Sequence, residues 1–217
     1  MTEKRSALRE RTREVIRDDI TSVAVQLFLE HGYDATTTDH IADAVGISQR
    51  SVFRYFPTKQ DIVVGKFGRG VDDMMTALEA RPADEPAWDS LRHMFDAATS
   101  NGGLDSYQVQ RMIFETPELL SVYLRTLHDA QVRASEVLID RAAATSTPYP
   151  PDDPASRALA AAAFGCLIAA QEMFLGSGST ERGLAPHLDR AMDAIIALGR
   201  PRPRTGRPPR ADRKSVV

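Results

Sequence analysis

Apolar residues recur at every third or fourth position along most of this chain, whereas the apolar–polar alternation of a β-strand is nearly absent. Between about 12 and 30, for example, Ile16, Ile20 and Leu27 fall on one helical face. The pattern therefore predicts an all-α fold. The expected helices cover about 12–30, a short segment that ends at Gly46, 49–56, a segment that starts after Thr58 and contains Leu78, 87–99, 104–115, 117–144, 155–175 and 185–198.

Residues that begin or end helices divide the first part of the chain. Gly32 suits the left-handed backbone that often follows the last turn of a helix, and Gly46 is expected to stop the next, short helix. Ser48 and Thr58 suit helix starts, because a hydroxyl oxygen accepts a hydrogen bond from a free backbone N–H group. Pro57 disfavours helical geometry in the residue before it. These signals predict two short helices between two longer ones.

The two short helices have the arrangement of a helix-turn-helix, whose second helix enters the major groove of DNA. On the outward face of this helix, Arg and Gln side chains can pair with base edges, and hydroxyl groups can hold phosphates. The residues of this face are Gln49, Arg50, Ser51, Arg54 and Tyr55. The apolar residues expected to pack the two helices together are Ile41, Ala42, Val45, Ile47, Val52, Phe53 and Phe56.

A helix-turn-helix shape is also a common packing unit of all-α proteins. Geometry alone therefore leaves open a helical ligand-binding or interaction module without specific DNA binding. The outward polar face favours DNA binding, because a module without that function would be expected to lose it. Lys59, in the first turn of the next helix, lies where backbone N–H groups also favour a phosphate.

Several short motifs occur together between about 15 and 65. They are Leu27-Phe28, Gly32-Tyr33, Thr36-Thr37-Thr38, Ile41-Ala42, Val45-Gly46-Ile47-Ser48, Ser51-Val52-Phe53-Arg54-Tyr55-Phe56 and Lys59. As a set they resemble the TetR family of transcriptional regulators. Many members have Gly or Pro where Arg50 stands, and often His or Tyr where Arg54 stands. These departures bear on the DNA sequence that is bound rather than on the family.

The resemblance implies a homodimeric repressor that a small molecule releases from its operator. Residues 1–60 would form a three-helix DNA-binding domain, and 61–199 a helical domain that dimerises and binds the effector. Two-fold symmetry then predicts an inverted-repeat operator. The implied DNA contacts are Thr38, Gln49, Arg50, Ser51, Tyr55 and Lys59, to which Arg54 is added.

The family's dimer is usually a four-helix bundle made by the last two helices of each subunit. The expected helix 155–175 is apolar nearly all round, which requires burial on several faces. The alternative is a central helix within one subunit. The residues expected at the dimer interface are Leu159, Ala162, Phe164, Cys166, Leu188, Met192 and Ile195.

In the family the middle helices enclose an effector cavity. Polar side chains among apolar neighbours mark such a site best, since a buried polar group needs a partner. The alternatives are core packing for the apolar residues, and an internal hydrogen bond or a solvent-facing position for the polar ones. The segment from Gln110 to Leu120 resembles an actinobacterial subgroup, some members of which sense acyl-CoA or lipid-like molecules. A large apolar effector is therefore expected. Its candidate contacts are Met75, Phe95, Arg111, Tyr123, His128 and Gln171.

Charge is distributed unevenly along the chain. The net charge is zero over 1–60, −9 over 61–199 and +6 over 200–217. The last segment is rich in Pro and Arg and predicts a disordered basic tail, which with Lys4, Arg5 and Arg9 would add phosphate attraction. Its Gly206-Arg207-Pro208 resembles the core of an AT-hook, and an inert tail is a further alternative.

The sequence offers little to enzymes, metals or membranes. It has no catalytic or phosphate-binding motif, and its five His are scattered, so neither an enzyme nor a cofactor is expected. One cysteine, Cys166, excludes an intramolecular disulfide and a cysteine-cluster metal site. The longest apolar run, 158–170, is short for a membrane span, and the charged N-terminus does not resemble a signal peptide. A cytoplasmic protein, nucleoid-associated when bound to DNA, is expected.

Overall fold

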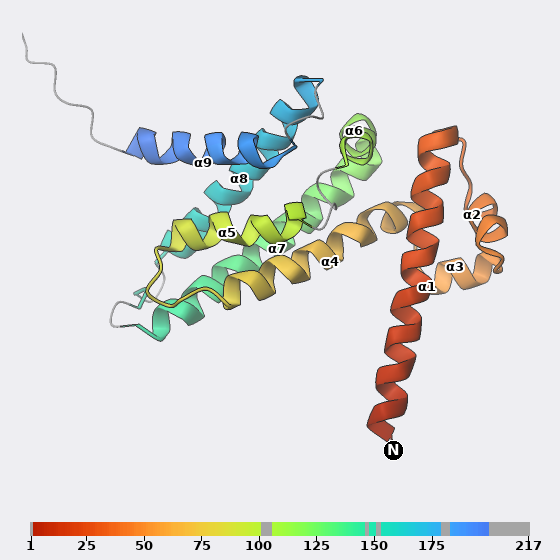
Figure 1. Ribbon diagram of the computed structural model, residues 1–217, viewed down its shortest axis with the longest axis horizontal. Coiled ribbons are helices and arrows are strands. Elements are labelled where there is room, and N and C mark those ends of the chain that lie inside the picture. The colour runs from red at the N-terminus through yellow and green to blue at the C-terminus, as the bar shows by residue number, and fades with distance from the viewer. Residues whose placement is uncertain (1, 101–105, 146–147, 151–152, 179–182, 200–217) are drawn as a thin grey trace, which may run out of the picture.

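The computed structural model describes residues 2–100, 106–145, 148–150, 153–178 and 183–199, which form nine α-helices and no strand (Figure 1). Side chains of 2–7, 66–69, 98–100 and 198–199 are not among those described, and the expected basic tail also lies outside the described residues. The all-α prediction is confirmed. The helices are α1 Thr2–His31, α2 Thr38–Val45, α3 Gln49–Tyr55, α4 Lys59–Glu79, α5 Ala87–Ser100, α6 Tyr107–Glu115, α7 Pro117–Ala143, α8 Ala155–Gly176 and α9 Ala185–Gly199.

The expected start and stop signals of the short helices are confirmed. Gly32 and Gly46 have positive φ angles of 90° and 77°, which residues with a side chain rarely adopt. Ser48 caps α3, since its Oγ accepts a hydrogen bond from the backbone N of Ser51 at 3.2 Å. Thr58 caps α4 in the same way and forms a reciprocal capping box with Asp61.

The first helix begins ten residues before the predicted start at about residue 12. Its side chains from Leu8 to Val15 are all exposed, so this part has no apolar stripe from which periodicity could detect a helix. It consists mainly of residues with good helix propensity, such as Ala, Leu, Glu, Arg and Lys. Figure 1 shows this part of α1 running well past α3.

Helix α4 joins the two halves of the molecule. In Figure 1, α2 and α3 lie on one side of α1, and α4 runs from α1 into a body formed with α5 to α9. The first turns of α4 bury Ile62 and Val63, and later turns bury Met74 and Leu78 against α5 and α7. A shift of α4 would therefore change its packing both against the part that contains α1 to α3 and within the body formed with α5 to α9.

Helix α8 is the most apolar element. It has 22 residues, and the mean hydropathy of its most apolar 18-residue window is 1.7. By length and composition it could cross a membrane, whereas the apolar run 158–170 was expected to be too short for a membrane span. It packs against α7 and α9, and Ala160, Phe164, Leu167 and Phe174 are buried. A core helix of a soluble protein has the same properties.

Candidate nucleic-acid interface

The helix-turn-helix is held by apolar contacts to α1. Ile41, Ala42, Val52 and Phe56 are at most 2% exposed, and Val45 and Ile47 are half-buried against the same core. The prediction for Phe53 is wrong, because its ring is 43% exposed. Phe53 follows Gln49 by four residues, which places both on the same side of α3. The outward face therefore contains an aromatic ring as well as polar groups.

The polar residues predicted for this face differ in exposure. Gln49, Arg50 and Arg54 are exposed, and among the described residues neither arginine takes part in an ion pair. Ser51 and Tyr55 are half-buried, and the Ser51 hydroxyl lies 2.9 Å from that of Ser48. Because no carboxylate among the described residues neutralises these two guanidinium groups, they give the face a positive charge.

A reciprocal hydrogen-bond pair begins α2 and holds Thr38 at its first turn. The Thr37 hydroxyl accepts from the His40 backbone N at 3.2 Å, while the Thr37 backbone N donates to Nδ1 of His40 at 3.3 Å. Thr38 itself is half-buried in the first position of the helix. The sequence reasoning did not identify His40 as a capping residue, because Glu or Gln is the usual partner in a capping box.

Lys59 is held inside the domain by three contacts. Its ammonium group donates to the backbone carbonyls of Tyr33 at 2.8 Å and Thr36 at 3.1 Å, and it lies 4.0 Å from the centre of the Tyr33 ring. Burial, with a smaller contribution from Glu118, raises the pKa of Tyr33 to about 12, so this ring stays neutral. Lys59 therefore holds the segment between α1 and α2 against the start of α4. This structural role was not expected from the sequence, which predicted only a phosphate contact.

Arg17 is a site residue that the sequence reasoning missed. From α1 it donates to the backbone carbonyl of Tyr55 at 2.9 Å, and its guanidinium lies 4.4 Å from the centre of the Phe56 ring. It thus holds the C-terminal end of α3 against α1. Its place at the edge of the apolar stripe, next to Ile16, gave no signal of this role.

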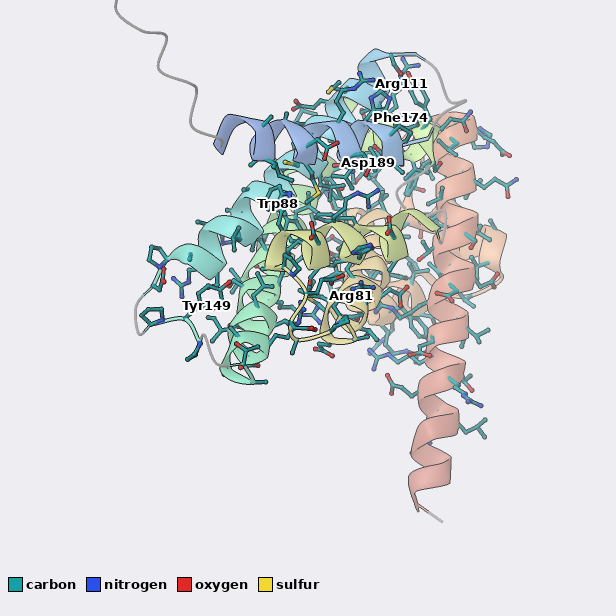
Figure 2. All side chains as sticks on the ribbon, turned by 60° about the vertical axis from the view of Figure 1, so that its left-hand side comes forward. Arg81, Trp88, Arg111, Tyr149, Phe174 and Asp189 are labelled. Atoms are coloured by element: carbon teal, nitrogen blue, oxygen red, sulfur yellow. The ribbon has the colours of Figure 1, made fainter. Side chains whose placement is uncertain are left out.

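The expected effector residues separate into two groups. Arg111 and His128 are exposed, and Arg111 pairs with Glu115 at 2.7 Å, so the solvent-facing alternative applies to both. Figure 2 shows Arg111 near the surface at the end of the domain where Phe174 lies. The other four expected residues are buried at 3% exposure or less: Met75, Phe95, Tyr123 and Gln171.

The buried group contains a polar pair. The Gln171 side-chain NH₂ donates to the Tyr123 hydroxyl at 2.6 Å, and burial raises the pKa of Tyr123 well above its usual range. Gln171 Oε1 and both amide atoms of Gln110 are buried and have no partner among the described residues. Such groups are costly in an apolar interior, typically by about 1–3 kcal/mol each.

The expected dimer residues mostly face the protomer's own core. Phe164, Cys166, Leu188 and Met192 are at most 5% exposed, because α8 and α9 pack against each other and against α5, α6 and α7. Leu159 and Ala162 are half-buried, and Ile195 is 43% exposed. An interface on these helices would instead use the outer face of α8. Its exposed residues are small or apolar at Ala158, Ala161, Gly165, Ala169, Met173 and Gly176, and charged at Arg157 and Glu172.

Two family models match the chain, one for each half. Residues 20–64 match the bacterial regulatory proteins of the tetR family, and residues 85–198 match the MftR C-terminal domain. The second match covers just over half of the chain. The first covers the end of α1, the helix-turn-helix and the first turns of α4.

Known relatives agree with these matches. The HTH-type transcriptional regulator TcmR of Streptomyces glaucescens is 30% identical over 143 residues, which are 62% of this chain and 63% of TcmR. The mycofactocin biosynthesis regulator MftR of Mycobacterium tuberculosis is 30% identical over 121 residues, 54% of this chain and 61% of MftR. These matches span about three fifths of each relative.

A solved structure shares the fold. It is the fatty acid degradation regulator FadR of Bacillus halodurans, with a TM-score of 0.59 and 18% identity, covering 84% of this chain and 99% of that chain. The chain therefore belongs to the TetR family of bacterial transcriptional regulators, a family of DNA-binding proteins rather than enzymes, and its C-terminal domain resembles that of MftR.

Proposed function

We propose that this protein is a homodimeric, sequence-specific repressor that leaves its operator when a largely apolar small molecule binds as effector. The observation that carries the proposal is the outward face of α3. Gln49, Arg50 and Arg54 are exposed there, and the arginines have no carboxylate partner among the described residues. The apolar side of the same helix packs against α2, which packs against α1, so the core of the domain supports this face.

The residues of the helix-turn-helix would make two kinds of contact with DNA, some to base edges and others to phosphates. Arg50 and Gln49 can each form two hydrogen bonds to a guanine or an adenine edge, which distinguishes base pairs in the major groove. Arg54, Tyr55 and Thr38 lie at the margins of the helix-turn-helix, where phosphate contacts would set its register. Ser51 is the remaining candidate, although its hydroxyl also contacts Ser48.

Dimerisation through α8 and α9 would place two such faces on a two-fold axis. Small exposed residues on the outer side of α8, such as Ala161 and Gly165, allow close approach of a partner helix. An isologous interface of this kind predicts an inverted repeat with half-sites about one helical turn apart or a little more. A cytoplasmic location follows from the need to reach DNA.

The effector would occupy the core around the pair Tyr123–Gln171. Tyr107 and Phe114 of α6 contact the rings of Phe174 and Tyr123 at 5.5 and 6.2 Å. Gln110 lies between them on the same helical face, so its amide points into this interior. A ligand that is mostly apolar but carries a group able to accept and donate hydrogen bonds would satisfy these amides. Met75 and Phe95 belong to the same buried core.

Release would be a population shift rather than a direct competition. The effector would favour a position of α4 in which the two recognition helices no longer match the operator, with a coupling of about 1–3 kcal/mol. Contacts on α4 could transmit this change, because Asp72 pairs with Arg133 of α7 at 2.9 Å while Ile62 and Val63 pack at the DNA-binding end.

The decisive experiment is selection of binding sites from random duplex DNA at fixed, near-physiological salt. Recovery of an inverted repeat is expected, and Arg50→Ala should then lose about 1–3 kcal/mol of discrimination at particular base pairs. If folded protein enriches no motif, the alternative of a helical module without specific DNA binding gains support. If Arg50→Ala weakens all sequences equally, the base-reading role of Arg50 is wrong.

A further inference from the structure

The N-terminal part of α1 extends past the recognition helix without packing on the rest of the protein. Figure 1 shows its first turns continuing beyond α3, and every described side chain from Leu8 to Val15 is exposed. Leu8 and Val15 are 66% and 67% exposed. Because none of these side chains is buried, the stability of the domain does not explain this part of the helix, and its role should lie in an external contact.

A groove lies between this extension and α3. It has a volume of about 730 Å³ and is lined by Leu8, Arg9, Thr12 and Arg13 of α1 and by Arg54 and Tyr55 of α3. All of its charged residues are arginines. The Arg54 guanidinium stacks 5.3 Å from the Tyr55 ring centre, which sets it at the edge of the groove next to the outward face of α3.

The three arginines have no anionic partner of their own. Among the described residues none of them forms an ion pair, and Arg9 and Arg13 are four residues apart, a spacing at which like charges repel. The acidic residues Glu10 and Glu14 do not line the groove but a second hollow, on the side of α1 that faces α4 and α7. Arg13 lies between the two and lines both, whereas Arg9 and Arg54 line only the groove. The lining of the groove itself is therefore positive.

We infer that this groove holds the phosphodiester backbone of the operator beside the major groove that α3 enters. The inference rests on the proposed DNA binding and extends it to a second surface. Charge complementarity favours a phosphate chain, since guanidinium groups bind phosphate oxygens with two parallel hydrogen bonds. Position favours DNA over another anion, because Arg54 belongs both to the groove and to the recognition helix. The groove would then contribute affinity and orientation without reading bases.

The test compares Arg9→Ala with Arg11→Ala. Both residues are exposed on α1, and each substitution removes one positive charge, but Arg11 does not line the groove. The probe is the duplex recovered by selection, and the readout is the slope of log Kobs against log[salt]. Arg9→Ala and Arg13→Ala should each make the slope less negative by about 0.9 for each lost phosphate contact, while Arg11→Ala should leave it nearly unchanged.

Hydroxyl-radical footprinting supplies a second readout. The wild-type protein should protect sugars next to each half-site, and Arg9→Ala should lose that protection while retaining the central footprint. If Arg9→Ala and Arg11→Ala change slope and footprint equally, the groove inference is overturned while operator recognition stands. If the wild-type protein selects no duplex, both the groove and the proposed function are overturned. Helicity by circular dichroism checks folding, which alanine should not impair.

Discussion

At the scale of single residues, Phe53 changes how the recognition helix is understood. Its ring is 43% exposed on the side that carries Gln49, so it is available for apolar contact with a thymine methyl group. We expect Phe53→Ala to weaken operator binding by about 1–2 kcal/mol, since full burial of such a side chain is worth about 1.5–3 kcal/mol. Titration of the selected duplex measures this loss.

The control for Phe53 is Ile139→Ala. Ile139 is also 43% exposed but lies on α7, away from the helix-turn-helix. Neither variant should lower the melting temperature much, because neither side chain is buried. Equal operator affinity in Phe53→Ala and wild type would show that Phe53 does not touch DNA.

Lys59 is expected to affect stability as well as binding. Its ammonium group forms hydrogen bonds to two backbone carbonyls and contacts the Tyr33 ring, and hydrogen bonds to a charged group are worth about 1.5–3 kcal/mol each. Lys59→Met should therefore lower the free energy of unfolding by about 2 kcal/mol, as chemical denaturation would measure. An unchanged denaturation midpoint with weaker DNA binding would instead support a purely phosphate-binding role.

The sequence predicted most of the residues on the outward face of α3, but not the contacts that individual residues make. Exposure of Gln49, Arg50 and Arg54 followed from helical periodicity, because the period assigns each residue to a side of the helix. Phe53 was misplaced since an aromatic residue was assumed to pack inward. Arg17 was missed because its partner is the backbone carbonyl of Tyr55, 38 residues away, and no local pattern encodes such a contact.

At the scale of elements, Gly65 sets how closely α4 approaches the end of α3. A Cβ at this position would lie 2.8 Å from Cε1 of Phe56, which directly follows α3. Gly65→Ala must therefore displace the Phe56 ring or α4. We expect it to lower the free energy of unfolding by about 1–3 kcal/mol, as overpacking does, and to weaken operator binding through the shifted recognition helix.

Gly70→Ala is the matched control in the same helix. A Cβ there meets nothing within 4 Å, and replacing a helical glycine by alanine should stabilise the protein by about 0.5–1 kcal/mol. Thermal unfolding and operator titration of both variants separate contact from helix propensity. If Gly65→Ala behaves like Gly70→Ala, then the approach of α4 to Phe56 does not position α3.

An ionic cluster holds the segment between α4 and α5 in place, and it should make the stability of the protein depend on pH. Hydrogen bonds from Arg81 and then Ser90 lower the pKa of Glu85 from 4.5 to about 2. A lowered folded-state pKa gives stability that is complete above about pH 4.5 and is lost as the pH falls toward 2. In denaturant titrations, Glu85→Gln should be less stable than wild type at neutral pH, and the difference should shrink over that range. A constant difference would contradict the assignment.

The elements themselves were largely predictable, with two instructive failures. The caps Ser48 and Thr58 and the glycine stops are local signals, so the end of α2, the start of α4 and, to within one residue, the bounds of α3 followed from the sequence. The start of α1 did not, because an exposed helix has no apolar stripe. The inner and outer faces of α8 could not be distinguished by periodicity, since both are apolar and only the packing of α7 and α9 identifies the inner one.

At the scale of the whole molecule, the distribution of charge fits the proposed arrangement. The segment 61–199 carries a net charge of −9, so this body should be repelled by DNA. Helix α3, which carries the exposed Arg50 and Arg54, lies on the side of α1 away from this body (Figure 1). This asymmetry would orient each protomer on its half-site before any base is read. The proposed effector contacts are instead buried amides, which sequence composition cannot place.

Dimerisation can be tested on the outer face of α8 without disturbing the protomer. Gly165 is exposed and a Cβ there meets nothing within 4 Å, so Gly165→Arg should fold and gain helix propensity. In a close helix–helix interface, however, the new side chain would bring an unpaired charge and bulk. We expect sedimentation to show a monomer, and operator titration to show weaker binding to an inverted repeat but unchanged binding to a half-site.

The matched control is Gly70→Arg, a second replacement of a helical glycine with open space around it. This variant should remain dimeric, because α4 lies away from the proposed interface. A dimeric Gly165→Arg would place the interface elsewhere, and the inverted-repeat geometry would then have to be derived from another symmetry axis. A monomeric Gly165→Arg that still binds the full repeat with wild-type affinity would show that two recognition helices do not act together. If Gly165→Arg loses both dimerisation and tight binding to the full repeat, then the small residues of α8 set the spacing of the two recognition helices on the operator.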